Sequence, residues 1–383
     1  MVDFRFDPGV ESFRAEVQTF LRAAMADAAR HPDPSDLTGL DEEFERRLSR
    51  AAGERGWLQL PRELRAVFEY EVARVDAPLI DTAMTLGGHV VATYGSAAQR
   101  EQLLGPMAAG EVLLCIAYTE EGAGSDLAAI ETVAERDGDG WVLHGTKVLV
   151  TGAHKADWCC TVARTRPDVP ARHGMSMFLL EMSTPGVEVV RRTTMNGWTL
   201  GDVHFRDVRV DAGALLGDVD NGWRQLMSSV ASERSHMSWM GFARHVLDLI
   251  VDHVQRTARD DPVARDTVGR LAVEFAAADR LARRTLWSLG RGEDDPALTS
   301  MFKVVATELL QDLAQAATEL AGPAGLTWAP LFGEAPVGSA AAGGGRFAYE
   351  YLERVHGTVS VGANEVQLDA IAQRGLGLPR PAQ

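Results

Sequence analysis

The spacing of apolar residues changes twice along the chain and divides it into three regions. In the first region apolar residues recur every three or four positions, which is the period of an amphipathic helix; they are Val10, Phe13, Val17, Phe20 and Leu21. Three later segments keep this spacing with short Gly or Pro interruptions, namely 41–56, 62–75 and 97–109. The pattern predicts an all-helical domain over residues 1–112.

In the second region the apolar residues form short segments rich in Val, Leu and Thr. Clusters of turn-forming residues separate these segments, for example DGDG at 137–140. We therefore predict a β domain with hairpin connections over residues 113–216. Two adjacent cysteines, Cys159 and Cys160, fall on one predicted strand, so their side chains should point to opposite faces of the sheet.

The helical period returns after Gly222 and predicts a third domain, helical, over residues 217–383. Within this domain we expect a turn at 260–262 and a flexible Gly/Ala-rich surface loop at 337–345. The order of helices, strands and helices predicts an α+β chain and argues against a doubly wound α/β sheet.

Composition narrows the classes of function. The chain has 383 residues, 46% of them hydrophobic, which is typical of a soluble globular protein with a sizeable core. Its net charge of −16 argues against a broad nucleic-acid-binding surface. Three cysteines without framework spacing indicate a reducing compartment. No signal segment begins the sequence and no apolar run of about 18 residues crosses a membrane, so we expect a cytoplasmic protein.

Several common motifs are missing from the sequence. No phosphate-binding G-x-x-x-x-G-K-[ST] motif and no zinc-binding H-E-x-x-H motif occur, and GAGSDL at 122–127 fails the dinucleotide fingerprint at its third glycine. Cysteines in an apolar strand are usually unreactive core residues. We therefore expect no metal ion and no cysteine nucleophile.

The stretch IAYTEEGAGSDLA at 116–128 is a candidate ligand-binding loop. Gly122 and Gly124 would let backbone amides approach a ligand closely, and Ser125 adds a hydroxyl group. Such a loop suits a pyrophosphate. The same composition is also typical of a plain turn, so the residues alone leave both interpretations open.

Glu233 is a candidate buried carboxylate. When residues 223–247 are projected on one continuous helix, Glu233 falls in the middle of the apolar face. One interpretation is that Arg234 or Arg244 neutralises this carboxylate. The other is that burial raises its pKa toward neutrality, as a general base requires.

Four motifs, in order along the chain, resemble those of the flavin-dependent acyl-CoA dehydrogenases. They are TEEGAGSD at 119–126, GTKVLVTGAHKADW at 145–158, HFRDVRV at 204–210 with LLGDVDNGW at 215–223, and GANEVQLDAIAQRGLGLP at 362–379. The resemblance implies an N-terminal helical domain, a central β-barrel-like domain and a C-terminal four-helix-bundle domain. It also implies FAD as cofactor and α,β-dehydrogenation of an acyl thioester to the 2-enoyl thioester.

The resemblance assigns cofactor contacts to residues of both later domains. Thr119 and Ser125 would contact the flavin and its phosphates, Thr151 would hydrogen-bond the isoalloxazine, and Arg256 would reach the pyrophosphate of a neighbouring subunit. The remaining implied cofactor contacts are Tyr118, Gly124, Leu149, Gly322, Ala363 and Glu365. Leu149 stands where the family usually has an aromatic residue beside the flavin.

The family carries its catalytic base in one of two places. Most members have it before a Gly-Thr near the C-terminus, where this chain has Val361. Isovaleryl-type and long-chain-type members have it on the first long helix after the β domain, where this chain has Glu233 followed by Arg234. The resemblance and the helical projection therefore both indicate Glu233 as the base, with Ser125, Arg234 and Met237 as substrate contacts.

Other departures from the family concern the acyl pocket and the subunit contacts. The usual P-x-E-Y-G-G loop, which borders the acyl pocket, is missing after GWLQLP at 56–61. The R-x-x-F-G stretch is replaced at 257–262, next to Arg256. We therefore expect a pocket of altered shape, and an altered contact across subunits.

Three functions are compatible with this pattern. The first is a catalytic dehydrogenase that acts on an acyl-CoA or an acyl-carrier-protein thioester and passes electrons to an electron-transferring flavoprotein, as a homodimer, a homotetramer or a hetero-oligomer with a related chain. The second, slightly favoured by Leu149 and Val361, is a catalytically weak subunit paired with an active relative, as in similar actinobacterial families. The third is a flavin oxidase or monooxygenase on the same fold.

Overall fold

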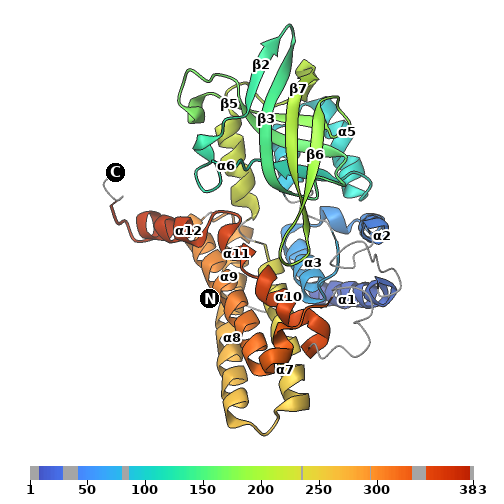
Figure 1. The fold of residues 1–383 in the computed structure, drawn as a ribbon, viewed down its shortest axis with the longest axis vertical. Coiled ribbons are helices and arrows are strands. Elements are labelled where there is room, and N and C mark those ends of the chain that lie inside the picture. The colour runs from blue at the N-terminus through green and yellow to red at the C-terminus, as the bar shows by residue number, and fades with distance from the viewer. Residues whose placement is uncertain are drawn as a thin grey trace. The chain divides into compact units, whose positions relative to one another are not determined.

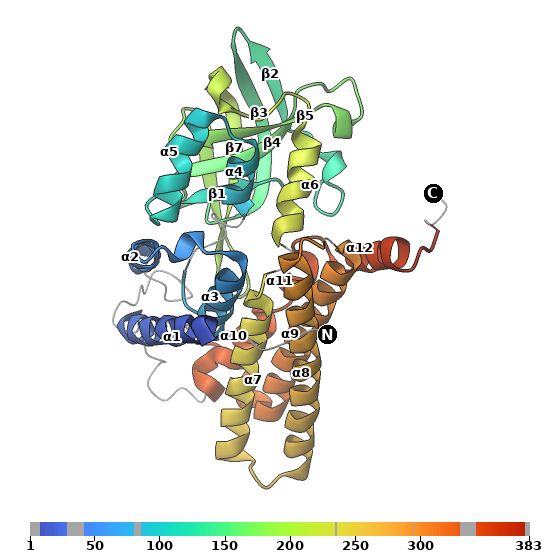
Figure 2. The same ribbon diagram turned by 180° about the vertical axis from the view of Figure 1, so that it is seen from behind.

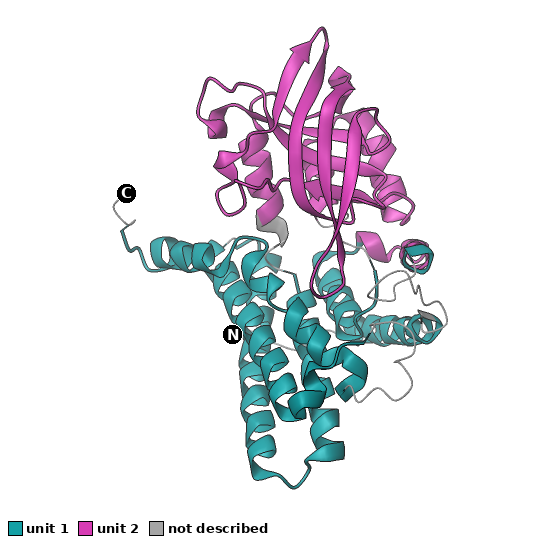
Figure 3. Cartoon of the chain, in the orientation of Figure 1, with its two compact units in different colours: residues 1–45, 60–79, 234–383 teal, residues 46–59, 80–233 magenta. Residues whose placement is uncertain are grey.

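The computed structural model describes residues 8–28, 42–79, 86–233, 236–293, 295–329 and 342–379 (Figure 1). The chain divides into two compact units (Figure 3). Unit 1 contains residues 1–45, 60–79 and 234–383, and unit 2 contains residues 46–59 and 80–233. Helix α2 (Glu42–Gly53) falls at the division between them. The domain boundaries expected from the sequence stay a prediction.

Unit 2 is built on an eight-stranded sheet with the order β6-β7-β3-β2-β4-β5-β8, to which β1 adds by pairing with β4. The strands are β1 (Leu114–Ala117), β2 (Val133–Asp137), β3 (Gly140–Thr151), β4 (Trp158–Arg164), β5 (Met175–Glu181), β6 (Val187–Thr193), β7 (Thr199–Val210) and β8 (Leu215–Leu216). The predicted hairpin at 137–140 is confirmed, since β2 and β3 pair antiparallel around Asp137 and Gly140. The pairs β1–β4 and β2–β4 are parallel.

The two faces of this sheet are covered in different ways. Three helices pack on one face (Figure 2): α4 (Gly88–Tyr94), α5 (Ala97–Ala108) and α6 (Gly222–Glu233). The other face packs on itself, because residues such as Trp141, Phe178 and Phe205 from different strands form one cluster. Cys160 belongs to the first cluster and Cys159 to the second, which confirms that the two thiols lie on opposite faces.

The expectation of a barrel is wrong, because the sheet is open. Its edge strands β6 and β8 do not pair with each other. β8 consists of two residues, Leu215 and Leu216, and pairs only with β5. A strand this short offers too few backbone groups for the second ladder that closure of a sheet requires.

Unit 1 is helical. Its helices are α1 (Pro8–Ala28), α3 (Arg62–Arg74), α7 (Ser238–Thr257), α8 (Pro262–Gly290), α9 (Pro296–Ala321), α10 (Arg346–Glu353), α11 (His356–Val359) and α12 (Asn364–Ala370). Asp261 and Asp295 cap α8 and α9, with a proline at the first helical position in each case, a common start for a helix. α3, α7, α8 and α9 pack around one apolar core that includes Leu271 and Phe302.

Two expectations for the helical region are revised. The structure has no single helix over 223–247, because α6 ends at Glu233, α7 begins at Ser238, and His236 and Met237 lie outside both helices. The turn at 260–262 is confirmed between α7 and α8. Of the predicted loop at 337–345, residues 337–341 lie outside the described residues, and 342–345 form a 3-10 turn.

Every helix in the described ranges is too short or too polar to cross a membrane.

Candidate functional site

The loop at 119–126 has a fixed base and an open tip. Its base is a small bridge, in which the Glu120 N–H donates to the Ala123 carbonyl at 3.1 Å and the Ala123 N–H donates to the Glu120 carbonyl at 3.0 Å. At the tip Gly122, Gly124 and Ser125 are exposed, and nothing lies within 4 Å of where a Cβ on either glycine would stand. The tip therefore leaves room for a ligand against the backbone.

Below the tip, the Glu120 side chain is buried in a network of charge-assisted hydrogen bonds. Its Oε1 lies 2.6 Å from Nζ of Lys147, whose side chain is fully buried. Its two oxygens also accept the N–H groups of Glu131 and Thr132 at 2.6 and 3.1 Å. Burial alone would raise the pKa of the Glu120 carboxyl. Lys147 and these hydrogen bonds lower the pKa by more than burial raises it, so the pKa lies below its ordinary value. Glu120 is therefore a mostly buried carboxylate, anchored by Lys147 and by two backbone N–H groups.

Strand β3 runs beside this loop and carries two of the predicted cofactor residues. The Val148 N–H donates to the Thr119 carbonyl at 2.9 Å, so the loop and the strand are joined at that point. Leu149 follows with a φ of 58° and a side chain that is 56% exposed. Thr151 is exposed at the end of the strand. The structure thus brings Thr119, Leu149 and Thr151 to one part of unit 2.

Tyr118 lies on the opposite side of the loop base, inside the core. Its hydroxyl donates to Oγ of Ser229 on α6 at 3.3 Å and lies 3.7 Å from Sγ of Cys160. Burial raises the pKa of this phenol well above its ordinary value. A contact of Tyr118 with a cofactor is therefore limited to its main chain, because its side chain is occupied in the core.

These features fit a flavin nucleotide. A phosphate needs backbone N–H groups and hydroxyls in an open loop, which Gly122, Gly124 and Ser125 offer. The ring system needs an apolar side chain that is free to be covered, with a hydroxyl nearby. Leu149 and Thr151 supply these two elements at the surface of unit 2.

In unit 1, a second fully buried lysine holds the segment 361–365. Nζ of Lys303 on α9 donates to the Gly362 carbonyl at 3.0 Å and to Oδ1 of Asn364 at 2.7 Å. The Gln367 side chain donates to the same carbonyl at 3.2 Å. Val361 has a φ of 58°, a conformation that is strained for a β-branched residue.

The other predicted cofactor residues of unit 1 do not all lie together. Ala363 is half-buried beside Gly362, and Glu365 is exposed in the first turn of α12. Gly322 ends α9, nineteen residues after Lys303, and at 1.5 Å per residue that length of helix spans about 28 Å. Arg256 is exposed in the last turn of α7 and pairs with Asp252.

Glu233 is the last residue of α6, and its side chain and all of Arg234 lie outside the described part of the structure. The backbone places position 233 one helical turn after Ser229, whose side chain is buried. The relation that the projection gave between Glu233 and Met237 does not hold, because Met237 lies beyond the end of α6.

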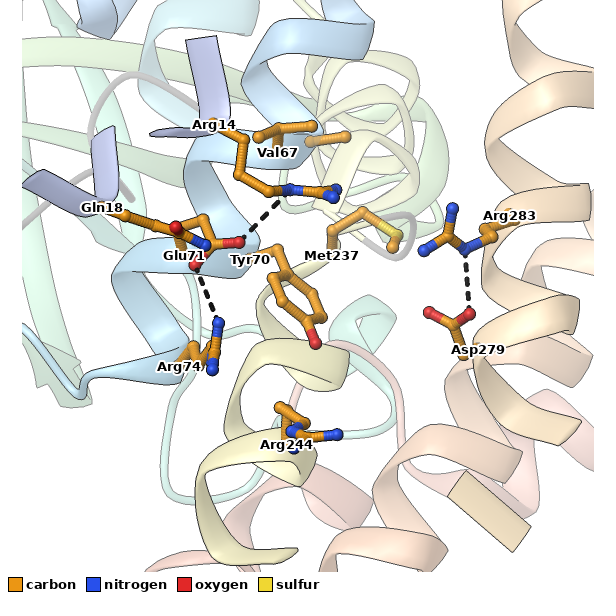
Figure 4. A pocket seen from close by; sticks show the side chains of 11 residues that line it. Arg14, Gln18, Val67, Tyr70, Glu71, Arg74, Met237, Arg244, Asp279 and Arg283 are labelled. Carbon is orange, nitrogen blue, oxygen red and sulfur yellow. Dashed lines mark hydrogen bonds and ion pairs between the residues drawn. The ribbon is translucent and has the colours of Figure 1, made fainter. Parts of the chain in front are cut away.

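Met237, the remaining predicted substrate contact, lines a cavity of about 220 Å³ in unit 1 (Figure 4). The ring of Tyr70 projects into the middle of this cavity, with Met237 beside it. Charged side chains also line it and form ion pairs: Arg14 with Glu71 at 3.3 Å, Arg74 with Glu71 at 3.6 Å, and Arg283 with Asp279 at 2.9 Å.

Burial raises the pKa of Tyr70 to about 12, with the nearby Glu71 carboxylate adding to the shift. The phenol is therefore neutral at physiological pH and can donate a hydrogen bond into the cavity. Arg244, a further lining residue, is held by Asp248 at 2.6 Å. The cavity combines an apolar part, from Met237 and Val67, with a polar part rich in guanidinium groups.

One group of described side chains has the donor atoms of a metal site. Single ligand atoms of Asp76, His245 and Glu350 lie within 4.8 Å of one another. Arg346 already binds Asp76 at 2.6 Å, and Arg354 binds Glu350 at 2.6 Å. The two carboxylates are therefore neutralised within the protein, which leaves little negative charge for a cation.

Three sequence profiles of one family match consecutive parts of the chain. The acyl-CoA dehydrogenase N-terminal domain matches residues 8–111, the middle domain matches 115–208, and the C-terminal domain matches 220–376. Acyl-CoA dehydrogenase IpdE1 of Mycobacterium tuberculosis is 30% identical over 402 residues, which cover 98% of this chain and 99% of that protein. This chain belongs to the acyl-CoA dehydrogenase family.

Solved structures agree with this membership. A structure described as the Tcur3481-Tcur3483 steroid ACAD superposes with a TM-score of 0.88 at 25% identity, over 99% of this chain and 100% of that one. The ChsE4-ChsE5 complex from Mycobacterium tuberculosis shares the fold, with a TM-score of 0.86 at 24% identity and coverage of 99% and 100%. As a member of the acyl-CoA dehydrogenase family, the chain is a flavoprotein oxidoreductase with FAD as its cofactor.

Sequence reasoning missed the two buried lysines of this acyl-CoA dehydrogenase. Both stand in apolar surroundings along the chain, Lys147 in TKVLV and Lys303 in MFKVVA. A lysine in such a run is a signal for a buried charge, but the partner cannot be read from local spacing. Lys147 binds a glutamate 27 positions earlier, and Lys303 binds a carbonyl 59 positions later.

Proposed function

We propose that this chain catalyses the α,β-dehydrogenation of an acyl thioester, with Glu233 as the general base. The observation that carries the proposal is the open loop of unit 2, where Gly124 and Ser125 are exposed beside Leu149 and Thr151. In a family that uses FAD, this is where the chain offers the groups that a flavin nucleotide needs.

The proposed reaction takes one proton and one hydride from the substrate. The Glu233 carboxylate removes the proton on the carbon next to the thioester carbonyl, and a double bond forms between that carbon and its neighbour. When bound, FAD supplies the acceptor for the hydride that leaves the neighbouring carbon. Thr119, Ser125 and Thr151 bind and orient the cofactor in this proposal, and Leu149 covers part of it.

Two observations support Glu233 as the base. Glu120, the other carboxylate of the cofactor region, is buried and paired with Lys147. Position 361, where most of the family carries the base, is a valine.

The test is the Glu233→Gln variant of the flavin-loaded protein. We expect this variant to keep its flavin absorbance and to lose exchange of the α-proton by about 10²–10⁴-fold, the contribution of a general base. Glu101→Gln, on an exposed glutamate of α5, is the matched control and should exchange at the wild-type rate. Wild-type exchange in Glu233→Gln would exclude this base.

The cavity of Figure 4 supports an acyl group that carries polar substituents. Met237 lines it, and the neutral Tyr70 hydroxyl can donate a hydrogen bond into it. We expect acyl-CoA thioesters with a distal hydroxyl, keto or carboxylate group to bleach the flavin at lower concentration than plain acyl-CoA of equal length. Tyr70→Phe should reduce that preference, and equal responses to both kinds of substrate would contradict it. The same acyl groups on a carrier protein test the choice of carrier.

The separation of Gly322 from Ala363 supports an oligomer. Lys303, which binds the Gly362 carbonyl beside Ala363, is separated from Gly322 by about 28 Å of helix α9. We therefore propose that Gly322 and Arg256 serve the cofactor of a second subunit. That subunit is another copy of this chain or a related chain, as the two-name descriptions of the Tcur3481-Tcur3483 and ChsE4-ChsE5 structures suggest for those proteins.

The partner-subunit alternative is favoured by Leu149 and Val361, which replace an aromatic residue and a carboxylate of the family pattern. Purification of the chain alone decides between the alternatives. A yellow protein that is bleached anaerobically by an acyl thioester, and that passes electrons to an electron-transferring flavoprotein, supports the dehydrogenase. A colourless protein that gains activity only with a related chain supports the partner subunit, and rapid formation of peroxide supports an oxidase.

A further inference from the structure

The ion pair between Lys147 and Glu120 stands out among the charged groups of unit 2. The Lys147 side chain is fully buried and that of Glu120 is 8% exposed. Taking such a pair out of water is costly unless each charge gains strong hydrogen bonds. Burial lowers the pKa of Lys147, an effect that Glu120 opposes. We therefore ask which parts of the chain this ion pair holds in place.

The pair joins three segments that are distant along the chain. Lys147 comes from β3, and its Nζ also donates to the Tyr118 carbonyl at 3.3 Å. Glu120 opens the loop, and its carboxylate accepts the N–H groups of Glu131 and Thr132, just before β2. The entry to the loop, its exit and the neighbouring strand are therefore fixed to one buried point.

Of the two residues in this ion pair, Glu120 is close along the chain to the exposed residues of the loop. Thr119 stands between Tyr118 and Glu120, whose carbonyl and carboxylate both bind Lys147. The bridge between Glu120 and Ala123 then sets the direction in which the chain continues to Ser125. Because the Glu120 carboxylate is mostly buried and already bound to Lys147 and to two backbone N–H groups, we expect the pair to act on a ligand through the backbone that it fixes.

The use of lysine in this chain points the same way. Only three of its 38 basic residues are lysines: Lys147, Lys155 and Lys303. Lys147 and Lys303 are fully buried, and each binds a backbone carbonyl in a segment assigned to the cofactor. A lysine has a slender stem and a compact charge, so it reaches an inner carbonyl where the planar arginine fork does not fit.

We propose that Lys147 and Glu120 are positioning residues for the flavin-binding loop, holding Thr119 and Ser125 in their binding geometry without touching the cofactor. This inference rests on the proposed role of the loop in binding FAD. In the TEEGAGSD motif, the buried Glu120 then positions the loop, and the exposed Ser125 contacts the cofactor.

The experiment measures the FAD dissociation constant of reconstituted full-length apoprotein by quenching of flavin fluorescence, with the thermal midpoint of each apoprotein. Glu120→Gln should weaken FAD binding by about ten-fold or more, the size expected when one charged anchor is lost. Glu135→Gln, the same change at an exposed glutamate of β2 outside the loop, is the matched control and should bind FAD within two-fold of wild type.

A second control separates positioning from general stability. The Asp157 carboxylate accepts the Leu113 N–H at 2.8 Å, at the other end of β1 from the loop. Asp157→Asn should lower the thermal midpoint and leave FAD affinity within two-fold of wild type. If Glu120→Gln fails to fold, Glu120→Gln combined with Lys147→Met leaves no unpaired buried charge, and we expect the same loss of affinity from it.

A double-mutant cycle on FAD affinity, with one change in the ion pair and one in the loop, decides whether the pair acts through the loop. If Glu120 acts through the loop, Ser125→Ala should weaken FAD binding on its own and add much less in the Glu120→Gln background. Fully additive effects, or an unchanged FAD affinity in both pair variants, overturn the positioning role. An unchanged affinity in both Ser125→Ala and Thr119→Val instead overturns the assignment of the loop, and the positioning inference with it.

Discussion

Two segments assigned to the cofactor, residues 119–126 in unit 2 and 361–365 in unit 1, are built alike but held by different chemistry. Each rests on a fully buried lysine, and each is accompanied by an apolar residue with a φ of 58°: Leu149 on the strand beside the loop, and Val361 at the start of the other segment. Lys147 binds a buried carboxylate, whereas the partners of Lys303 described above are a carbonyl and an amide oxygen. Among the contacts described above, those of Lys147 include an ion pair, and those of Lys303 are hydrogen bonds to neutral oxygens.

This difference teaches where each segment is vulnerable. An ion pair is lost as a whole when one partner is removed, because the remaining charge stays buried. A lysine that binds neutral oxygens leaves groups that cost less when they are unpaired. The loop of unit 2 should therefore be the more sensitive of the two to a change in charge.

The largest expected effect is that of Lys147→Met. This change leaves the Glu120 carboxylate buried without its cation, and we expect the free energy of unfolding to fall by about 3–5 kcal/mol. Denaturant unfolding of the full chain measures the change. Lys155→Met, on the remaining lysine, which is half-buried, is the control. An effect of Lys147→Met no larger than that of the control would show that the pair adds nothing to stability.

Lys303→Met should have a smaller effect, about 1–3 kcal/mol, because it removes hydrogen bonds to the Gly362 carbonyl and Asn364 Oδ1. The same unfolding experiment measures it. The comparison fails if the cost equals or exceeds that of Lys147→Met, since the two lysines would then be equivalent.

The pH dependence of stability sharpens the contrast further. The pKa of Glu120 lies below its ordinary value of 4.5 in the folded chain, so its stabilisation is complete above about pH 4.5 and is lost as the pH falls through the folded pKa. Unfolding of wild type and of Glu120→Gln, followed from pH 7 to pH 3, should show a steeper acid loss in wild type. Parallel curves would mean that Glu120 does not contribute to it.

The smallest expected effect comes from Val361→Gly. Glycine adopts a φ of 58° without strain, which relieves about 1–2 kcal/mol, but it costs about 0.5–1 kcal/mol of backbone entropy. We expect a net gain between zero and about 1.5 kcal/mol in unfolding free energy. Val366→Gly, within the ordinary helix α12, is the control and should destabilise by about 1 kcal/mol. Destabilisation by Val361→Gly would show that the valine side chain stabilises the segment.

Local patterns predicted those parts of the fold that depend on neighbours in sequence. The alternation of side chains along a strand placed Cys159 and Cys160 on opposite faces, and the DGDG turn placed the hairpin at 137–140. Closure of the sheet depends instead on whether the distant edges β6 and β8 meet, which no local pattern encodes. The interruption between α6 and α7 was missed because the apolar spacing continues through it.

The candidate site follows the same rule. The open loop with Ser125 was found because glycines and hydroxyls in one short stretch are visible in the sequence. The sequence shows that Glu120 belongs to the motif, but it does not show that Glu120 is buried. Its burial depends on Lys147 and on two N–H groups from another segment. Glu233 as the base stays a prediction that rests on helical spacing and on the resemblance.

The placement of the cysteines has a practical consequence. The three thiols of the chain, Cys115, Cys159 and Cys160, are all buried in strands β1 and β4 of unit 2. Burial raises the pKa of Cys160 to about 12, which keeps it as an unreactive thiol while unit 2 is folded. The rate at which a thiol-specific dye reacts with the native protein therefore reports how often unit 2 unfolds locally and exposes these thiols, because unit 1 contains no cysteine. The three native cysteines thus allow local unfolding of unit 2 to be measured separately from that of unit 1.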